Sequence, residues 1–350
     1  MSPAPRPGLR EVEPYQAPQL EVRARLNTNE CPYPLPEGFL EDLAMAVRQL
    51  QLHRYPDREA TRLREALAQA AGHVPEGTWV ANGSNEVLLQ LLLAYGGPGR
   101  TAVVFPPTYV LHERIAWTAH TEVTRVPLGP GFLLGAGEVE RALALRPQVA
   151  FVCSPNNPTG NAQPLDVVER LAAALDGLVI VDEAYVEFGG ESALPLLGRH
   201  PNLVVVRTFS KAFALAGARI GYCLATPEVV EDLRRVRLPY HVSALTQAAG
   251  LAALRHREEA QAILGDVRRE RDRILAVLRA MPGVEAFPSD ANFVLFRPPR
   301  PAAEVFRGLL DRGVLVRDLS DAVEGCLRVT AGTPAEVDLF LEALEEVLAT

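Results

Sequence analysis

Short apolar segments alternate with helical segments over most of the chain, and this alternation limits its possible folds more than any other feature. Two of the predicted strands, residues 149–153 (VAFVC) and 178–181 (LVIV), are apolar throughout and not only at every second position. Strands of this kind are covered on both faces, as in a parallel sheet between two layers of helices. The sequence therefore predicts an α/β domain with a largely parallel sheet.

The pattern divides the chain into three regions. Residues 1–38 are rich in proline and turn-forming residues, and we expect an N-terminal arm that associates with the small domain. Residues 39–244 contain the alternating segments and are expected to form a large cofactor-binding domain. Residues 245–350 begin with a long Arg- and Glu-rich helical stretch and continue with shorter strands, which predicts a smaller α+β domain.

The expected elements follow from these patterns. In the large domain the strands are residues 79–81, 102–105, 122–126, 149–153, 178–181, 203–207 and 220–224, and the helices include 59–71, 86–93, 165–175 and 227–237. In the small domain they are the helical stretch 245–281, the strands 292–296, 314–317 and 326–329, and the helix 335–348.

Charge and motif spacing exclude several classes of function. The net charge is −8, which argues against nucleic acid or an anionic membrane as a partner. The four cysteines form no C-x-x-C pair and the seven histidines no H-x-x-x-H pair, so neither a metal site nor a disulfide framework is expected. The first residues lack a secretory profile, and no apolar stretch approaches the roughly 18 residues of a membrane span. We expect a soluble, cytoplasmic protein.

Lysine is almost absent from the chain. Of the 35 basic residues Lys211 is the only lysine, and the other 34 are arginines. Arginine replaces lysine well as a surface cation, but a guanidinium does not normally lose a proton or form an imine with an aldehyde. Taken alone, one surviving lysine has an even chance of being accidental; its neighbours along the chain favour a chemical role.

Polar residues follow four of the predicted strands at their carboxyl ends, where ligands bind in open parallel sheets. Each segment has an ordinary structural explanation when taken singly, such as a turn at Asn-Pro or a helix cap at a strand-end Asp. Four such segments in adjacent positions, one of which contains the only lysine, favour a shared site. They are residues 82–86 (NGSNE), 154–160 (SPNNPTG), 182–185 (DEAY) and 208–211 (TFSK).

These residue types suit the chemistry of pyridoxal phosphate. The cofactor needs a lysine, here Lys211, to form a Schiff base with its aldehyde and then to move a proton. It also needs a carboxylate, here Asp182 on the innermost strand, to keep its pyridine nitrogen protonated. Its phosphate needs amide, hydroxyl and arginine donors. The candidates for that role are Ser84, Asn85, Thr208, Ser210 and Arg219.

Residues 210–222 (SKAFALAGARIGY) closely resemble the lysine signature of the fold-type I, class II aminotransferases that use pyridoxal phosphate. Residues 153–160 (CSPNNPTG) and 181–188 (VDEAYVEF) match the same family in the same order. The resemblance covers the chain from about residue 13 to its end. It implies an aspartate-aminotransferase-like fold, with a mostly parallel seven-stranded sheet in the large domain, and a homodimer with shared active sites.

The resemblance also implies roles for individual residues. Asn157 and Tyr185 would hydrogen-bond the 3′-oxygen of the cofactor, and Tyr109 would stack on its pyridine ring. Tyr55 would reach the cofactor phosphate of the neighbouring subunit. Tyr185 joins Lys211 and Asp182 as a candidate catalytic residue, and the Asn157–Pro158 peptide bond is expected to be cis. Asn85 stands where many relatives have Asp, which leaves its cofactor contact open.

Within this family the chain most resembles the histidinol-phosphate aminotransferases, which exchange an amino group between L-histidinol phosphate and 2-oxoglutarate in histidine biosynthesis. The resemblance rests on Tyr15, on residues 26–30 (LNTNE) and 54–57 (RYPD), and on Arg317 and Arg328. It implies that the two arginines hold the substrate phosphate with help from Tyr15, and that Arg328 also holds the carboxylate of glutamate. Asn157 and Tyr240 are further candidates for contacts with the substrate.

Other activities remain open at this point. An aromatic or other amino-acid aminotransferase would share the fold, as would a threonine-phosphate decarboxylase, whose substrate also carries a phosphate. A regulatory protein with this fold would have an added DNA-binding domain, for which the 38-residue arm is too short. A nicotinamide-dependent oxidoreductase would need G-x-G-x-x-G after the first strand, and residues 129–135 (GPGFLLG) have the wrong spacing.

Overall fold

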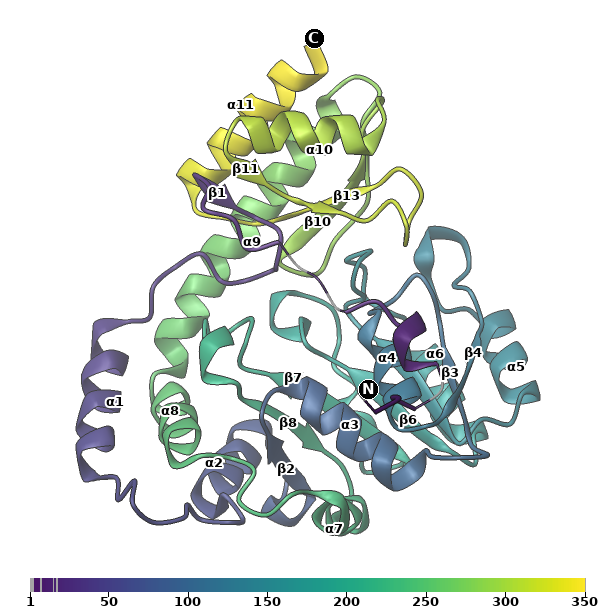
Figure 1. Cartoon of the computed structure of the whole chain (residues 1–350), viewed down its shortest axis with the longest axis vertical. Helices are drawn as coiled ribbons and strands as arrows, with labels where there is room; N and C mark the ends of the chain where they lie inside the picture. The colour runs from purple at the N-terminus through teal and green to yellow at the C-terminus, as the bar shows by residue number, and fades with distance from the viewer. Residues whose placement is uncertain (1–2, 7, 15, 17, 350) are drawn as a thin grey trace.

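Seven strands form one sheet through the larger part of the molecule (Figure 1). The computed structural model describes residues 3–6, 8–14, 16 and 18–349. The order across the sheet is β2 (Thr78–Ala81), β8 (Gly221–Leu224), β7 (Leu203–Thr208), β6 (Leu178–Asp182), β5 (Val149–Cys153), β3 (Thr101–Val104) and β4 (Glu122–Arg125). Only β8 runs antiparallel to its neighbours. The predicted mostly parallel sheet is confirmed, and β6, which ends in Asp182, is its central strand.

Both faces of this sheet are covered by helices, as the apolar strands require. In β5, Val149 and Phe151 pack on one side while Ala150 and Val152 pack on the other, and all four are buried. One face is covered by α3 (Ser84–Tyr95), α4 (Leu111–Thr118) and α7 (Pro227–Val236). The other is covered by α1 (Glu37–Gln49), α2 (Thr61–Ala71), α5 (Ala136–Ala144), α6 (Leu165–Ala174) and α8 (Ala244–Arg255).

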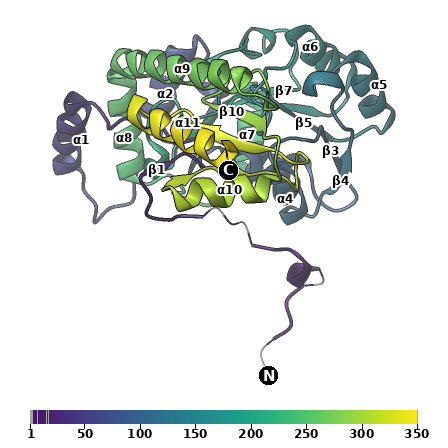
Figure 2. The same cartoon turned by 90° about the horizontal axis from the view of Figure 1, so that it is seen from above.

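A smaller α+β unit lies above the large sheet in Figure 1. Figure 2 views the molecule from above, so this unit lies in front of the large sheet there. Its antiparallel sheet has the order β12 (Arg317–Asp318), β13 (Leu327–Thr330), β10 (Phe293–Arg297) and β9 (Glu285–Ala286). The helices α9 (Arg257–Ala280), α10 (Ala302–Asp311) and α11 (Pro334–Ala349) bury apolar residues against it. The N-terminal segment joins this unit, because β1 (Ala24–Arg25) pairs in parallel with β11 (Val314–Leu315).

The boundary between the two units differs from the expected one. A boundary after residue 244 would place α8 in the small domain, but its buried residues Ala249, Ala252 and Ala253 belong to the core of the large sheet. The buried residues of α9, beginning with Leu264, belong instead to the small core. The predicted helical stretch 245–281 divides at His256, between α8 and α9. We therefore propose that the small domain begins near residue 256.

The carboxyl ends of β5, β6, β7 and β2 lie at the same edge of the large sheet, because these four strands are parallel to one another. The expectation that they occupy adjacent positions was wrong in one detail, since β8 lies between β7 and β2. In the described part of the chain, no helix combines the length and apolar character needed to cross a membrane.

Candidate active site

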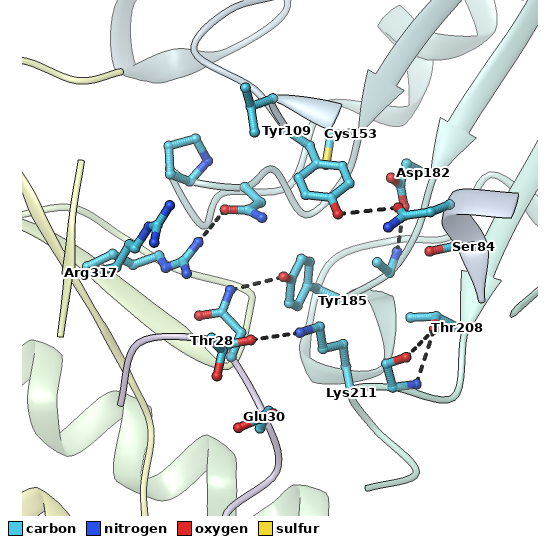
Figure 3. A pocket seen from close by; sticks show the side chains of 18 of the residues that line it. Thr28, Glu30, Ser84, Tyr109, Cys153, Asp182, Tyr185, Thr208, Lys211 and Arg317 are labelled. Atoms are coloured by element: carbon cyan, nitrogen blue, oxygen red, sulfur yellow. Dashed lines mark hydrogen bonds between the residues drawn. The ribbon is translucent and has the colours of Figure 1, made fainter. Parts of the chain in front are cut away.

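A cavity of about 250 Å³ opens at this edge of the sheet, and residues of the small unit line its other side (Figure 3). It brings together twelve of the residues singled out from the sequence. These are Ser84, Asn85, Tyr109, Asn157, Asp182, Tyr185, Thr208, Ser210, Lys211, Arg219, Arg317 and Arg328. The sequence therefore located the cavity, although the structure alone assigns no chemical role to its residues.

Lys211 follows the carboxyl end of β7 and projects its amine into the cavity (Figure 3). Its Nζ donates a hydrogen bond of 2.9 Å to the carbonyl oxygen of Thr28. Burial lowers the pKa of the Lys211 ammonium to about 7; the charges of Arg328 and Arg219 act in the same direction and Glu30 opposes them. A large neutral fraction near pH 7 makes this amine both a nucleophile and a proton acceptor.

Asp182 ends the central strand and is only 2% exposed. One carboxylate oxygen accepts a 3.0 Å hydrogen bond from Nε2 of His112, and the other accepts one of 3.2 Å from the backbone N–H of Ala184. His112 is fully buried and stacks on Phe151, with ring centroids 4.7 Å apart. The carboxylate is thus fixed in position and retains lone pairs for a further donor inside the cavity.

The start of α3 and the loop after β7 form a cradle for an anion. Ser84 and Asn85 are the first residues of α3, where backbone N–H groups have no partner within the helix. Arg219 lies beside them, donates to Ser210 Oγ at 3.3 Å, and has a left-handed backbone with φ 53°. Thr208 Oγ1 lies 3.0 Å from the same Ser210 hydroxyl.

Two glycines allow this cradle to form. A Cβ at Gly83 would lie 2.5 Å from Nη2 of Arg219, and φ at Gly83 is +83°. A Cβ at Gly221 would lie 2.1 Å from the backbone nitrogen of Ser84. Because glycine has no Cβ, the helix start, β8 and the arginine can approach one another closely, and neither position tolerates a side chain. The donors gathered here fit a phosphate group.

Three further residues surround the space between Asp182 and the cradle. The Tyr109 hydroxyl donates to Asn85 Oδ1 at 3.3 Å, and the Tyr185 hydroxyl accepts from Asn29 Nδ2 at 3.0 Å. Burial raises the pKa of the Tyr185 phenol to about 12. Asn157 Oδ1 accepts a 2.5 Å hydrogen bond from Arg328, and the Asn157–Pro158 peptide bond is cis, as expected. Aromatic, phenol and amide groups thus line the space that an aromatic ring would occupy.

Two arginines reach the cavity from the small unit. Arg328 on β13 is buried; its Nη1 and Nη2 donate to Asn157 and to the carbonyl oxygen of Asn27, at 2.5 and 2.9 Å. Arg317 on β12 is more exposed and donates to the carbonyl oxygen of Gln16 at 2.9 Å. Both guanidinium groups therefore line the cavity that contains Lys211.

Two residues selected from the sequence, Tyr55 and Tyr240, lie outside the cavity of this chain. Tyr55 is 80% exposed and stacks on Tyr240, with ring centroids 4.4 Å apart. Tyr240 has φ 55° and does not line the cavity of its own chain, because the loop before α8 turns it outward to Tyr55. Tyr15 lies outside the described residues.

Sequence reasoning missed two parts of the site. His112 gave no signal, because its contact with Asp182 exists only once α4 packs on the sheet, 70 residues from its partner. Residues 27–30 were noted for resemblance alone, yet this segment contacts Arg328, Lys211 and Tyr185. The signal that was available for it is the run of polar residues, NTNE, directly after an apolar leucine.

A lysine amine, a buried carboxylate and an anion cradle in one cavity fit pyridoxal phosphate, and with this fold they define the fold-type I class of enzymes that use it. The chain belongs to the family Aminotransferase class I and II, whose sequence model matches residues 24–344. It is 50% identical over 347 residues to the histidinol-phosphate aminotransferase of Thermobifida fusca, covering 97% of this chain and 94% of the relative.

Solved structures agree on the fold. The histidinol-phosphate aminotransferase of Sinorhizobium meliloti in complex with pyridoxal-5′-phosphate is 27% identical with a TM-score of 0.85, covering 94% of this chain and 92% of that one. The L-threonine-O-3-phosphate decarboxylase of Porphyromonas gingivalis is 25% identical with a TM-score of 0.83, covering 93% and 100%. The fold therefore accommodates both activities, and the sequence relatives favour transamination.

Proposed function

We propose that this chain is an aminotransferase that carries pyridoxal phosphate on Lys211 and exchanges an amino group between L-histidinol phosphate and 2-oxoglutarate. The products are imidazole-acetol phosphate and L-glutamate, in histidine biosynthesis. The observation that carries the proposal is a single cavity that holds the only lysine of the chain, a buried carboxylate and three arginines. The relatives with about half of their residues identical support the choice of substrate.

The residues of the large sheet would hold the cofactor. Its phosphate would bind at Ser84, Asn85, Thr208, Ser210 and Arg219, and its pyridine nitrogen would donate to Asp182. His112 holds that carboxylate in place at 3.0 Å. Tyr185 and Asn157 would contact the ring oxygen, and Tyr109 would cover one ring face. When bound, the cofactor accepts the electron pair released as the substrate loses its α-proton.

Lys211 would move the proton in this reaction. Its Nζ takes the proton from the α-carbon of the substrate, which requires a neutral amine. Because burial lowers its pKa to about 7, the amine becomes neutral as the pH rises through 7 and is lost as an acceptor below that pH. The carbonyl oxygen of Thr28, 2.9 Å away, holds the amine when it is not bound to the cofactor.

The arginines of the small unit would bind the anionic end of the substrate. A phosphate dianion has enough oxygens to accept two parallel hydrogen bonds from each of two guanidinium groups. Arg328 and Arg317 together therefore suit a phosphate ligand better than a single carboxylate ligand. Arg328 would also hold the carboxylate of glutamate when the second substrate enters. Tyr15 would assist at the phosphate.

We also propose a homodimer in which each chain completes the site of the other. The stacked pair Tyr55 and Tyr240 is exposed, and Leu52, Leu238 and Leu245 beside it in the sequence are exposed as well. A cluster of exposed large apolar residues is characteristic of a protein interface. Across such an interface Tyr55 would reach the cofactor phosphate of the partner, and Tyr240 its substrate.

The four cysteines are free thiols, which supports a reducing, cytoplasmic location.

Borohydride reduction tests the cofactor assignment. Reduction of the holoenzyme should fix the cofactor on the peptide that contains Lys211, and no other lysine competes for it. Recovery of unlabelled Lys211 from an active, reduced enzyme would refute the assignment.

Substrate comparison tests the choice among related activities. We expect a larger kcat/KM for histidinol phosphate than for phenylalanine, with glutamate formed from 2-oxoglutarate. Release of carbon dioxide from threonine phosphate without glutamate would favour the decarboxylase, which the structural similarity noted above keeps as the second candidate.

A further inference from the structure

Asn29 is a buried polar residue in an unusual backbone conformation beside the cavity. It is 1% exposed and has φ 55°, in the left-handed region that asparagine adopts more often than most residues other than glycine. Its neighbours on the same segment, Thr28 and Glu30, also line the cavity. The backbone conformation turns this polar segment toward the cavity without requiring strain.

Hydrogen bonds from Thr330 at the end of β13 and from Asn292 just before β10 hold Asn29, and the Thr330 hydroxyl orients its side chain. Its backbone N–H donates to Thr330 Oγ1 at 3.1 Å, and the Thr330 hydroxyl donates to Asn29 Oδ1 at 3.0 Å. Asn292 donates to the Asn29 carbonyl oxygen at 3.2 Å. With Oδ1 turned to β13, Nδ2 points to Tyr185 and donates to its hydroxyl at 3.0 Å, a bond drawn in Figure 3.

This arrangement determines where the phenol proton of Tyr185 can go. A phenol oxygen that accepts from an amide N–H has its own O–H left to donate elsewhere. Asn29 Nδ2 is a donor and offers no lone pair for that proton. The cavity side of Tyr185, where the proposed function places the ring oxygen of the cofactor, is left for the O–H.

We propose that Asn29 is a positioning residue for Tyr185: it donates to the phenol oxygen and so directs the phenol proton to the ring oxygen of the cofactor. This rests on the proposed function. The donated bond also makes the phenol a stronger donor, because an amide N–H stabilises negative charge on the phenol oxygen. Burial keeps Tyr185 protonated at neutral pH, since its pKa is raised to about 12.

The alternative is a purely structural role, in which Asn29 only fastens the N-terminal segment to β13. The two roles differ in one measurable property, the pH midpoint of the visible absorbance change of the bound cofactor. A donor at the ring oxygen stabilises its negative charge and so lowers that midpoint. A structural tie would change thermal stability and leave the midpoint in place.

The experiment is a pH titration of the absorbance of the holoenzyme and its Asn29→Gly variant. Glycine keeps the left-handed backbone and removes the amide. We expect the midpoint to rise by about 0.5 to 1 pH unit, the equivalent of one hydrogen bond, and by less than in Tyr185→Phe. In a Tyr185→Phe background, Asn29→Gly should add no further shift, since the bond it removes is already lost.

Asn292→Ala is the matched control, because it removes a side-chain hydrogen bond to the Asn29 carbonyl oxygen and leaves the donor to Tyr185 in place. It should lower Tm without moving the midpoint. Should Asn29→Gly fail to fold, Asn29→Asp decides: this isosteric acceptor captures the phenol proton, so it should raise the midpoint by more than it does in the Tyr185→Phe background, where only its added charge acts. An unshifted midpoint in the folded variant, or a full shift in the Tyr185→Phe background, overturns the inference. A wild-type protein without any Lys211-bound absorbance refutes the proposed function instead.

Discussion

The two sides of the cavity are built in different ways. On the large-sheet side, the loop after β7 brings together residues close in sequence: Ser210 lies two residues from Thr208 and nine from Arg219, although His112 and Asp182 are 70 residues apart. On the small-unit side, Asn27 and Asn29 meet Arg328 and Thr330 across 301 residues of sequence. The first side is assembled by loops at one edge of a sheet, and the second only when the two ends of the chain come together.

Because the two sides are built differently, we expect them to have different roles, and substitutions can test this expectation. The large-sheet side would hold the cofactor and determine the chemistry, while the small-unit side would select the substrate. If so, substitutions on the first side should reduce turnover with every substrate, and substitutions on the second should act most on the anionic group of one substrate.

The largest effect is expected from Lys211→Arg. The variant keeps a positive charge but lacks an amine that can bond to the cofactor or carry the proton, so kcat should fall by about a thousand-fold or more with every amino donor. Single-turnover kinetics with histidinol phosphate and with glutamate measure the loss. Near-normal turnover with either donor would remove Lys211 from the mechanism.

The second prediction concerns the reactivity of the Lys211 amine in the cofactor-free enzyme. With a pKa of about 7 in place of 10.5, the amine is about half neutral at pH 7, a fraction about a thousand-fold larger than that of an ordinary lysine, so it should be acylated at pH 7. The rate should rise with pH and level off above 7. Mass spectrometry of the Lys211 peptide against pH gives the midpoint, and the N-terminal amine provides an internal control.

This titration also tests whether the two sides act independently. The charge of Arg328 contributes to the lowered pKa of Lys211, so Arg328→Gln should move the midpoint upward. An unchanged midpoint would show that the charge of Arg328 does not contribute to the low pKa of Lys211.

The contrast between the sides also explains what the sequence could predict. Apolar strands and the polar residues after them located the sheet, its central Asp182 and the lysine loop, because strand ends in a parallel sheet meet at one edge. His112 was not predicted, because a single histidine on a helix belongs to no recognisable sequence motif. Tyr240 was expected at the substrate pocket, but the fold of one chain turns it outward to Tyr55.

The third prediction addresses the small-unit side. Arg328→Lys keeps the charge but loses the forked donors to Asn157 and to the Asn27 carbonyl oxygen. A lysine also cannot donate two parallel hydrogen bonds to a phosphate or a carboxylate, and the loss of one charge-assisted hydrogen bond costs about 1.5 to 3 kcal/mol. We therefore expect kcat/KM to fall by up to about a hundred-fold for histidinol phosphate and for glutamate. Cofactor absorbance should persist. Loss of the cofactor from this variant would contradict the proposed division.

A smaller and more selective effect is expected from Arg317→Lys. Arg317 is partly exposed and contacts the N-terminal arm through Gln16, so the loss of its fork should lower kcat/KM for histidinol phosphate by about ten-fold. Phenylalanine, which has no phosphate, is the matched control and should change by less than about two-fold. Equal losses for both would mean that Arg317 supports the fold of the cavity and does not recognise phosphate.

The smallest expected effect tests whether the partner subunit contributes to the site in addition to the two sides of the cavity. Tyr55→Phe removes one phenol hydroxyl, and if that hydroxyl binds the cofactor phosphate of the partner, the cofactor Kd should rise about five-fold. Tyr95→Phe, whose hydroxyl bonds to Asp232 on the surface, is the matched control and should leave the Kd unchanged. Mixed dimers identify the donor: in a Tyr55→Phe chain paired with a Lys211→Arg chain, the site that retains Lys211 receives an intact Tyr55 from the other chain. That site should bind the cofactor with wild-type affinity, whereas a tyrosine acting within its own chain would leave it weakened.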